Sequence, residues 1–326
     1  MTNPLILVRD VHFASTVIVA GTIFFDMFVA APVLGTDLRL RATACSFGTT
    51  TRKIVLLFLG VSIASAIAWL SLLSARIAGV TIGEAIADGT MWVVVSGTRF
   101  GVAWTMRILC AIILLAVSLP PRRNIKAGTA AWRKAASTLL AGFYLGSLAF
   151  GGHGEEGLGF QRYIHLSADF LHLVAAGLWL GGLVPFALLL SYLLRLREEG
   201  WAVTACDAGG RFSTLGIVAV SILLMSGTIN ASFLVRGIGG LTGTRYGQLL
   251  LLKIALFIAM VCLAAINRQH LLPRLRGESE MGRNKLATQL LVRSAMVEMA
   301  LGLIIIVIVG ILGITQPATD MTSHLH

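Results

Sequence analysis

The chain alternates between long apolar segments and short polar ones, and the apolar segments have the length of membrane-spanning helices. A helix needs about 20 mostly apolar residues to cross the hydrocarbon core of a bilayer. Runs of this kind predict eight transmembrane helices, at residues 7–31, 54–74, 100–119, 136–151, 166–194, 212–235, 248–266 and 294–314. Residues 84–98 fit either an interfacial helix or an early start of the third span.

Composition supports a membrane protein and excludes several soluble classes. Hydrophobic residues make up 56% of the 326 residues, charged residues only 13%, and the mean hydropathy is +0.86. Because soluble globular domains carry about 25% charged residues, this chain lacks the charge to cover a globule in water. We therefore exclude a soluble enzyme, a disordered tail and a disulfide scaffold. The sequence predicts an all-α polytopic membrane protein, with the lipid bilayer as its surroundings.

The basic residues lie mostly on one side of the predicted spans. Of the 26 Lys and Arg residues, 18 fall in the loops 32–53, 120–135, 195–211 and 267–293, and 6 fall on the opposite side. Because cytoplasmic loops carry the excess of Lys and Arg, we expect these four loops in the cytoplasm and both termini outside. The net charge of +11 then follows from topology, and we expect no nucleic-acid partner.

The two halves of the chain resemble each other in three places. The matching residues are Arg99-Phe100-Gly101 and Arg107-Ile108 against Arg245-Tyr246-Gly247 and Lys253-Ile254, His12 and Gly21 against His172 and Gly181, and Val61-Ser62-Ile63 against Val220-Ser221-Ile222. The matches predict a four-plus-four duplication within one membrane domain, with its halves at 1–152 and 153–326. Because each half has an even number of spans, the halves run parallel and are related by an axis along the membrane normal.

The sequence contains no motif for nucleotide-driven or hydrolytic chemistry. It has no G-x-x-x-x-G-K-[ST] loop for ATP phosphates, no H-E-x-x-H zinc motif and no G-x-S-x-G nucleophile turn. We therefore expect neither ATP use nor enzymatic activity, and any transport must draw on a gradient.

Histidines on the outer side are the candidate metal ligands. His165, Asp169 and His172 follow the spacing i, i+4, i+7 and so share one face at the outer end of the fifth span. His153 precedes His165 by twelve residues, so the short connection brings it near, and His12 is the repeat counterpart of His172. Imidazole suits Cu, Zn, Fe or Ni. The alternative is that these histidines only bind headgroups or water.

Ionisable residues inside the spans are the other candidates, because burying them in a membrane is costly. Asp26 and Glu298 are expected near the inner ends of the first and last spans, and Arg107 and Lys253 near the outer side. Lys253 is positioned to neutralise Asp169 or Asp10, and Arg107 is its repeat counterpart. The pattern fits buried ion pairs or a proton or ion relay equally well.

A series of motifs in the second half resembles the copper resistance protein D (CopD/PcoD) family. They are Gly152-His153-Gly154, the run from Ser167 to Leu183, Arg211-Phe212-Ser213, Ser226-Gly227 with Asn230, Tyr246-Gly247 with Leu251-Leu252-Lys253, Asn267-Arg268 with Pro273-Arg274-Leu275, and Glu298 with Gly302. The resemblance is dense over residues 150–315 and loose over 1–150. It implies that His153 and His172 occupy the family's histidine positions, and that Asp169 and Lys253 occupy its recurrent charged positions.

The resemblance implies a bacterial inner-membrane protein of copper homeostasis, with eight helices and both termini in the periplasm. We expect it to capture a copper ion, Cu(I) or Cu(II), at His12, His153, His165 and His172, and to import it. The family often works with a small periplasmic copper carrier of the CopC type. Two alternatives remain. One is a membrane electron carrier in which His12 and His172 bind a b-type haem, and the other is a scaffold or assembly factor for a copper enzyme.

Overall fold

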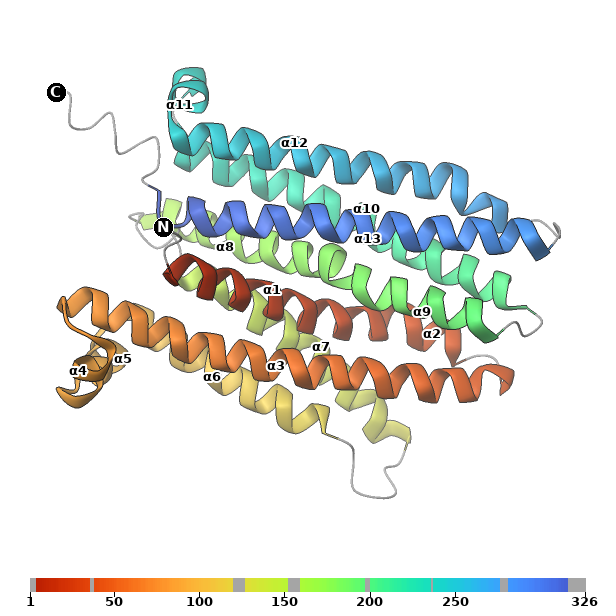
Figure 1. The fold of residues 1–326 in the computed structure, drawn as a ribbon, viewed down its shortest axis with the longest axis horizontal. Helices are drawn as coiled ribbons and strands as arrows, with labels where there is room; N and C mark the ends of the chain where they lie inside the picture. The colour runs from red at the N-terminus through yellow and green to blue at the C-terminus, as the bar shows by residue number, and fades with distance from the viewer. Residues whose placement is uncertain are drawn as a thin grey trace.

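The computed structural model of the chain describes residues 4–35, 38–119, 127–151, 159–196, 200–235, 237–275 and 281–315, and every regular element in these ranges is helical. The long helices run side by side along the long axis of the molecule (Figure 1). They are α1 (Pro4–Phe25) with α2 (Ala31–Leu34), α3 (Arg41–Ala78), α6 (Arg99–Ser118), α7 (Ala127–Gly146), α8 (Gly159–Ala176) with α9 (Gly182–Leu196), α10 (Trp201–Leu234), α12 (Arg245–Ile266) and α13 (Met281–Leu312).

Seven helices within the described residues are long and apolar enough to cross a membrane, which confirms a polytopic all-α protein. Each of them overlaps one of the predicted spans. The remaining predicted span, 136–151, falls on α7 and the 3-10 turn that follows it at Ser147–Gly151, and α7 is not among the seven. It nevertheless packs against α1, α6 and α8. The count of eight spans therefore stays a prediction.

The segment 84–98 is a separate element and not the beginning of the third span. It forms two short helices, α4 (Ile82–Ala87) and α5 (Thr90–Gly97), beside the end of α3 (Figure 1). Thr98 has an extended backbone between α5 and α6 and accepts a hydrogen bond from the Gly101 N–H. This cap starts α6 as a new helix.

The centre of the bundle is formed by α1 and by α8 with α9. In each of them 61% of the most apolar window is buried inside the protein, against 6% for α12. They cross where a Cβ atom added to Gly21 would overlap the backbone of Gly181, so both positions require glycine. Gly177 is packed as closely, because a Cβ there would overlap the Leu145 side chain, and small residues of this kind let membrane helices approach each other.

Three of the long helices contain a wider, π-helical turn, and each turn comes before a proline. The turns are η1 (Asp26–Ala30), η5 (Gly177–Gly181) and η6 (Asn267–Leu271), and Pro32, Pro185 and Pro273 follow them. A proline has no N–H to bond the carbonyl four residues earlier, and in all three cases that carbonyl belongs to the π turn. The wider turn lets the chain continue past the lost hydrogen bond.

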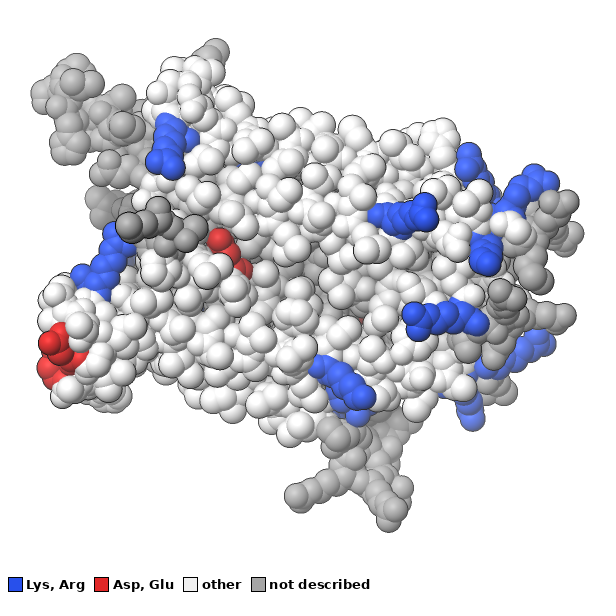
Figure 2. Space-filling model, viewed as in Figure 1, with Lys and Arg blue, Asp and Glu red and all other residues white. Residues whose placement is uncertain are grey.

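Charge divides the two ends of the bundle. The end where α3 and α13 begin and α9 ends carries most of the visible Lys and Arg side chains, and the middle of this face is almost without charge (Figure 2). We call this the basic end. Helix α1 begins and α13 finishes at the opposite end (Figure 1). The uncharged middle is what a membrane-spanning surface requires.

Candidate functional site

Two groups of polar side chains lie between the helices in the half of the bundle away from the basic end. The C-terminal cluster contains His165, Asp169 and His172 of α8, Ser226 and Asn230 of α10, and Lys253 of α12. The N-terminal cluster contains His12 of α1, Ser62 and Ser65 of α3, Arg107 of α6, and Tyr144 of α7 with Ser147 next to it. Each cluster pairs a histidine with a basic side chain.

His172 is held by a hydroxyl group on the neighbouring helix. Its Nδ1 lies 2.9 Å from Ser226 Oγ, and that hydroxyl donates to the Ile222 carbonyl at 2.6 Å. Because the Ser226 proton is used on the carbonyl, the oxygen accepts from the His172 Nδ1–H. This assignment leaves a lone pair on Nε2. A metal-binding histidine normally has its other nitrogen engaged in this way.

His12 has the same arrangement with a backbone partner. Its Nδ1 lies 3.0 Å from the Ser62 carbonyl and 3.2 Å from Ser65 Oγ. A carbonyl only accepts hydrogen bonds, so Nδ1 carries the proton and Nε2 has the lone pair. That Nε2 is fully buried and has no hydrogen-bond partner in the structure. The ring is 5.8 Å from the Trp69 ring, so its surroundings are aromatic.

The two basic side chains differ in how their charge is balanced. Lys253 interacts electrostatically with Asp169, as predicted, and Asn230 Nδ2 donates to Asp169 Oδ1 at 2.5 Å. Arg107 instead donates to the Ser147 carbonyl at 2.8 Å and lies over the Trp69 ring at 5.9 Å. It has no carboxylate partner within the described part of the chain. The C-terminal cluster therefore contains a charge-balanced pair, and the N-terminal cluster contains an uncompensated cation.

His165 lies one turn before Asp169 but forms no hydrogen bond with it. Its Nε2 is 3.9 Å from Asp169 Oδ2, which is beyond hydrogen-bonding distance. This buried nitrogen has no hydrogen-bond partner among the residues that the structure describes. Its ring stacks on Phe233 of α10, with 4.9 Å between the ring centres. The i, i+4 spacing therefore does bring the two side chains together on one helix face.

The remaining candidate residues lie elsewhere. Asp26, in η1, forms an exposed ion pair with Lys134 of α7 at 3.0 Å. Glu298, on α13, accepts a hydrogen bond from Asn267 and does not meet Asp26. His153 lies outside the described residues, as do His324 and His326. Within the described ranges no three His, Cys, Asp or Glu side chains come close enough to hold a metal ion together, so the four-histidine site stays a prediction.

The hydroxyl groups that hold the histidines were not identified from the sequence. The repeat match paired Ser62 with Ser221, yet His172 bonds Ser226, and Ser221 lines a separate cavity. No sequence pattern pointed to Tyr144, whose hydroxyl lies 2.6 Å from Ser62 Oγ. The N-terminal caps of α6 and α12 show a closer match between the two halves of the chain. Thr244 accepts from the Gly247 N–H at 3.0 Å, as Thr98 does from Gly101.

Comparison with known proteins gives matches over both halves of the chain. The family model "Copper resistance protein D-like, N-terminal domain" matches residues 1–163, and "Copper resistance protein D" matches residues 207–312. Copper resistance protein D of Pseudomonas syringae pv. tomato is 31% identical over 265 residues, which cover 78% of this chain and 84% of that protein. The comparison with solved structures gave no significant match.

Two further relatives support the same assignment. Inner membrane protein YebZ of Escherichia coli (strain K12) is 33% identical over 227 residues, which cover 70% of this chain and 72% of that protein. Copper transport protein CutJ of Bacillus subtilis (strain 168) is 33% identical over 190 residues, which cover 57% of this chain and 33% of that protein. Together with the apolar helices, these matches show a multi-pass protein of the inner membrane that belongs to the copper resistance protein D family.

Proposed function

We propose that the protein captures copper at the C-terminal cluster and carries it across the inner membrane toward the basic end. The observation that carries the proposal is the arrangement of His172, whose Nδ1 is fixed by Ser226 while Nε2 is left to bind a metal. His165, on the same face of the same helix, has a buried Nε2 with no hydrogen-bond partner among the described residues. His153 is proposed as a third ligand from the preceding loop.

Charge balance favours the C-terminal cluster over the N-terminal one as the copper site. A copper ion next to Lys253 meets a cation whose charge Asp169 already offsets. A copper ion at His12 would face the buried Arg107, which has no described carboxylate partner. Because like charges in a low-dielectric interior repel strongly, we propose that His12 contributes to copper passage only after capture. Asp169 and Lys253 act as an ion pair, and Asp169 reduces the repulsion between Lys253 and a bound copper ion.

The orientation of transport rests on the distribution of basic residues. We propose that the basic end faces the cytoplasm, that both termini are periplasmic, and that residues 1–152 and 153–326 are parallel repeats. The matched threonine caps of α6 and α12 support the repeat. The clusters then face the periplasm, where a carrier of the CopC type is the proposed source of copper, as Cu(I) or Cu(II). We propose import as the direction of transport.

Copper uptake into vesicles tests the proposal. Purified protein is reconstituted in lipid vesicles, and internal copper is measured with time for the wild type, His172→Ala and His270→Ala. His270 is exposed near the basic end and serves as the matched control. We expect uptake by the wild type and His270→Ala and at least a tenfold loss in His172→Ala. Equal uptake by both variants would refute the site, and copper binding without any uptake would favour the scaffold alternative.

A second candidate function is electron transfer through a b-type haem. The observation in its favour is that His12 and His172 each have a bound Nδ1, while His12 Nε2 is buried and free of hydrogen bonds. Axial haem ligands have the same requirement. Iron in the purified protein, with a Soret band that disappears in His12→Ala and in His172→Ala, would establish it.

A further inference from the structure

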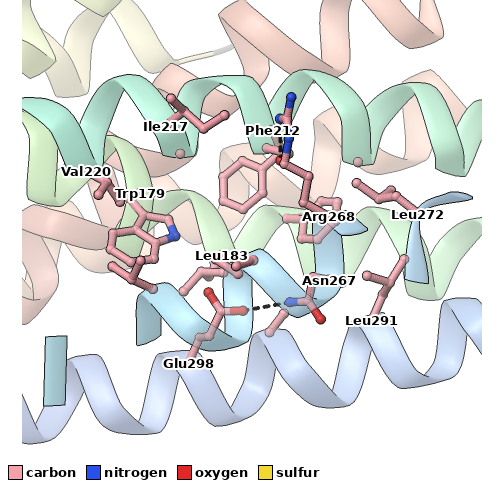
Figure 3. Close-up of a pocket in the computed structure, with 18 of the residues that line it drawn as sticks. Trp179, Leu183, Phe212, Ile217, Val220, Asn267, Arg268, Leu272, Leu291 and Glu298 are labelled. Atoms are coloured by element: carbon pink, nitrogen blue, oxygen red, sulfur yellow. Dashed lines mark hydrogen bonds between the residues drawn. The ribbon is translucent and has the colours of Figure 1, made fainter. Parts of the chain in front are cut away.

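The inner half of the bundle contains a cavity that the copper site does not use. It has a volume of about 230 Å³ and lies between α9, α10, α13 and the junction of α12 with η6 (Figure 3). Most of its lining is apolar, including Leu183, Phe212 and Val220. Glu298 points into it from α13 and Arg268 from η6, and these are its two ionisable lining residues. A buried carboxylate in a mostly apolar cavity calls for an explanation.

Glu298 has neutral hydrogen-bond partners and no described counter-ion. The side chain is 2% exposed, and its Oε1 accepts from Asn267 Nδ2 at 2.9 Å (Figure 3). The Trp179 indole and the Ser294 hydroxyl also interact with the carboxylate. No salt bridge to Glu298 occurs within the described residues. A buried charge with only neutral partners is costly, so small changes nearby suffice to add or remove a proton.

Arg268 lies on the exposed side of the cavity and is held away from Glu298. Its Nη1 donates to Ser213 Oγ on α10 at 2.9 Å, in an exposed hydrogen bond. The hydroxyl therefore fixes the guanidinium between α10 and η6, where it lines the cavity without pairing with the carboxylate. Arg268 is exposed, so it marks the side on which the cavity lining reaches the protein surface.

Two of the three π-helical turns converge on this one carboxylate. Trp179 belongs to η5 and Asn267 belongs to η6, so two of its three named partners come from irregular turns on two different helices. Such turns are frequent at functional sites. Asp26 in η1 is a useful contrast, because it forms an exposed ion pair with Lys134. Asp26 thus has the counter-ion that Glu298 lacks.

We propose that Glu298 is a proton-exchange site inside the membrane, reached from the basic end through the cavity beside Arg268. One O–H bond forms at a Glu298 carboxyl oxygen while one O–H bond of a hydronium ion breaks, so the carboxylate becomes neutral, a water molecule is released and no electron is transferred. Uptake and release of this proton accompany copper passage. This last step rests on the proposed copper transport, whereas the proton site itself does not.

Infrared difference spectroscopy on copper-free protein in lipid tests the proton site. Between alkaline and acidic buffer, the wild type should gain the carbonyl band of a buried protonated carboxyl group. Glu298→Gln should lose that band, and Glu84→Gln, an exposed glutamate on α4, should keep it. A band that persists in Glu298→Gln, or no such band in the wild type, would overturn the proposal.

A second variant covers the case in which Glu298→Gln fails to fold. Trp179→Phe keeps an aromatic ring and removes the indole N–H that interacts with the carboxylate. We expect the band to remain but the pH at which it appears to shift. An unshifted band in Trp179→Phe would mean that the band does not belong to Glu298.

Vesicle uptake under an imposed pH gradient tests the coupling. Wild-type copper uptake should change with the gradient, and Glu298→Gln should bind copper normally but lose this dependence. Dependence that survives in Glu298→Gln would overturn the coupling. If wild-type vesicles take up no copper, both transport and coupling are refuted, and the infrared result decides the proton site alone.

Discussion

Ser226→Ala removes the hydrogen bond that holds His172 but keeps the His172 imidazole, so it tests what the hydrogen bond contributes to copper binding. The alanine leaves the imidazole in place but removes the hydroxyl that lies 2.9 Å from Nδ1. Ser226 is 3% exposed, so no bulk water replaces the lost partner. The His172 ring is then free to rotate, and its Nδ1–H is left unsatisfied. Both effects weaken binding through Nε2.

The size of the effect follows from the hydrogen bond that is lost. Leaving a buried donor without a partner costs about 1–3 kcal/mol. At about 1.4 kcal/mol for each tenfold change in affinity, copper binding should weaken roughly 5- to 100-fold. This range overlaps the roughly 10- to 100-fold loss that is usual when a partner of a metal-binding histidine is removed.

The assay is copper affinity of detergent-purified protein, measured by competition with a chelator, together with thermal unfolding. Ser232→Ala is the matched control, because its exposed hydroxyl donates only to the Ile229 carbonyl of its own helix. We expect Ser226→Ala to lose affinity while both variants unfold as the wild type does within a few degrees. Unchanged affinity in Ser226→Ala would refute the assignment of His172 as a copper ligand.

Further predictions concern the helix crossing and the buried ion pair. Gly21→Ala should destabilise the protein by about 1–3 kcal/mol in chemical unfolding, because the new Cβ overlaps the Gly181 backbone. Gly60→Ala is the control and should not destabilise the protein, because a Cβ at Gly60 meets nothing within 4 Å. Equal stability of the two variants would contradict the close crossing of the helices. Lys253→Met should destabilise by on the order of 2 kcal/mol without loss of copper content, because Asp169 is left uncompensated. Adding Asp169→Asn should restore most of the stability, and a failure to do so would refute the pairing.

The membrane-spanning segments were predictable from the sequence, but the helix ends were not. Helix α3 begins at Arg41, well before the predicted span at 54–74, because the polar segment continues as helix. Phe47 is buried there and packs against the ring of Tyr192. Hydropathy measures the part of a helix that lies in hydrocarbon and not the part that packs beyond it. The prolines that follow the π turns were the sequence feature from which these turns could have been predicted.

The candidate site was predictable where it depends on spacing within one helix. His165, Asp169 and His172 share a face of α8, as their spacing requires, and Lys253 meets Asp169. The hydroxyl partners of the histidines on neighbouring helices were missed, because each residue turns a helix by about 100° and an approximate repeat match does not fix which side chain faces the histidine. The match paired Ser62 with Ser221, whereas His172 is held by Ser226.

The metal content of the wild-type protein tests the central claim most directly. Protein purified in detergent after growth with added copper is analysed for copper and iron in the same sample by inductively coupled plasma mass spectrometry. The proposed capture site predicts about one copper per chain, lost in His172→Ala, and no iron. Near-stoichiometric iron without copper would contradict copper capture and would make the protein a haem carrier.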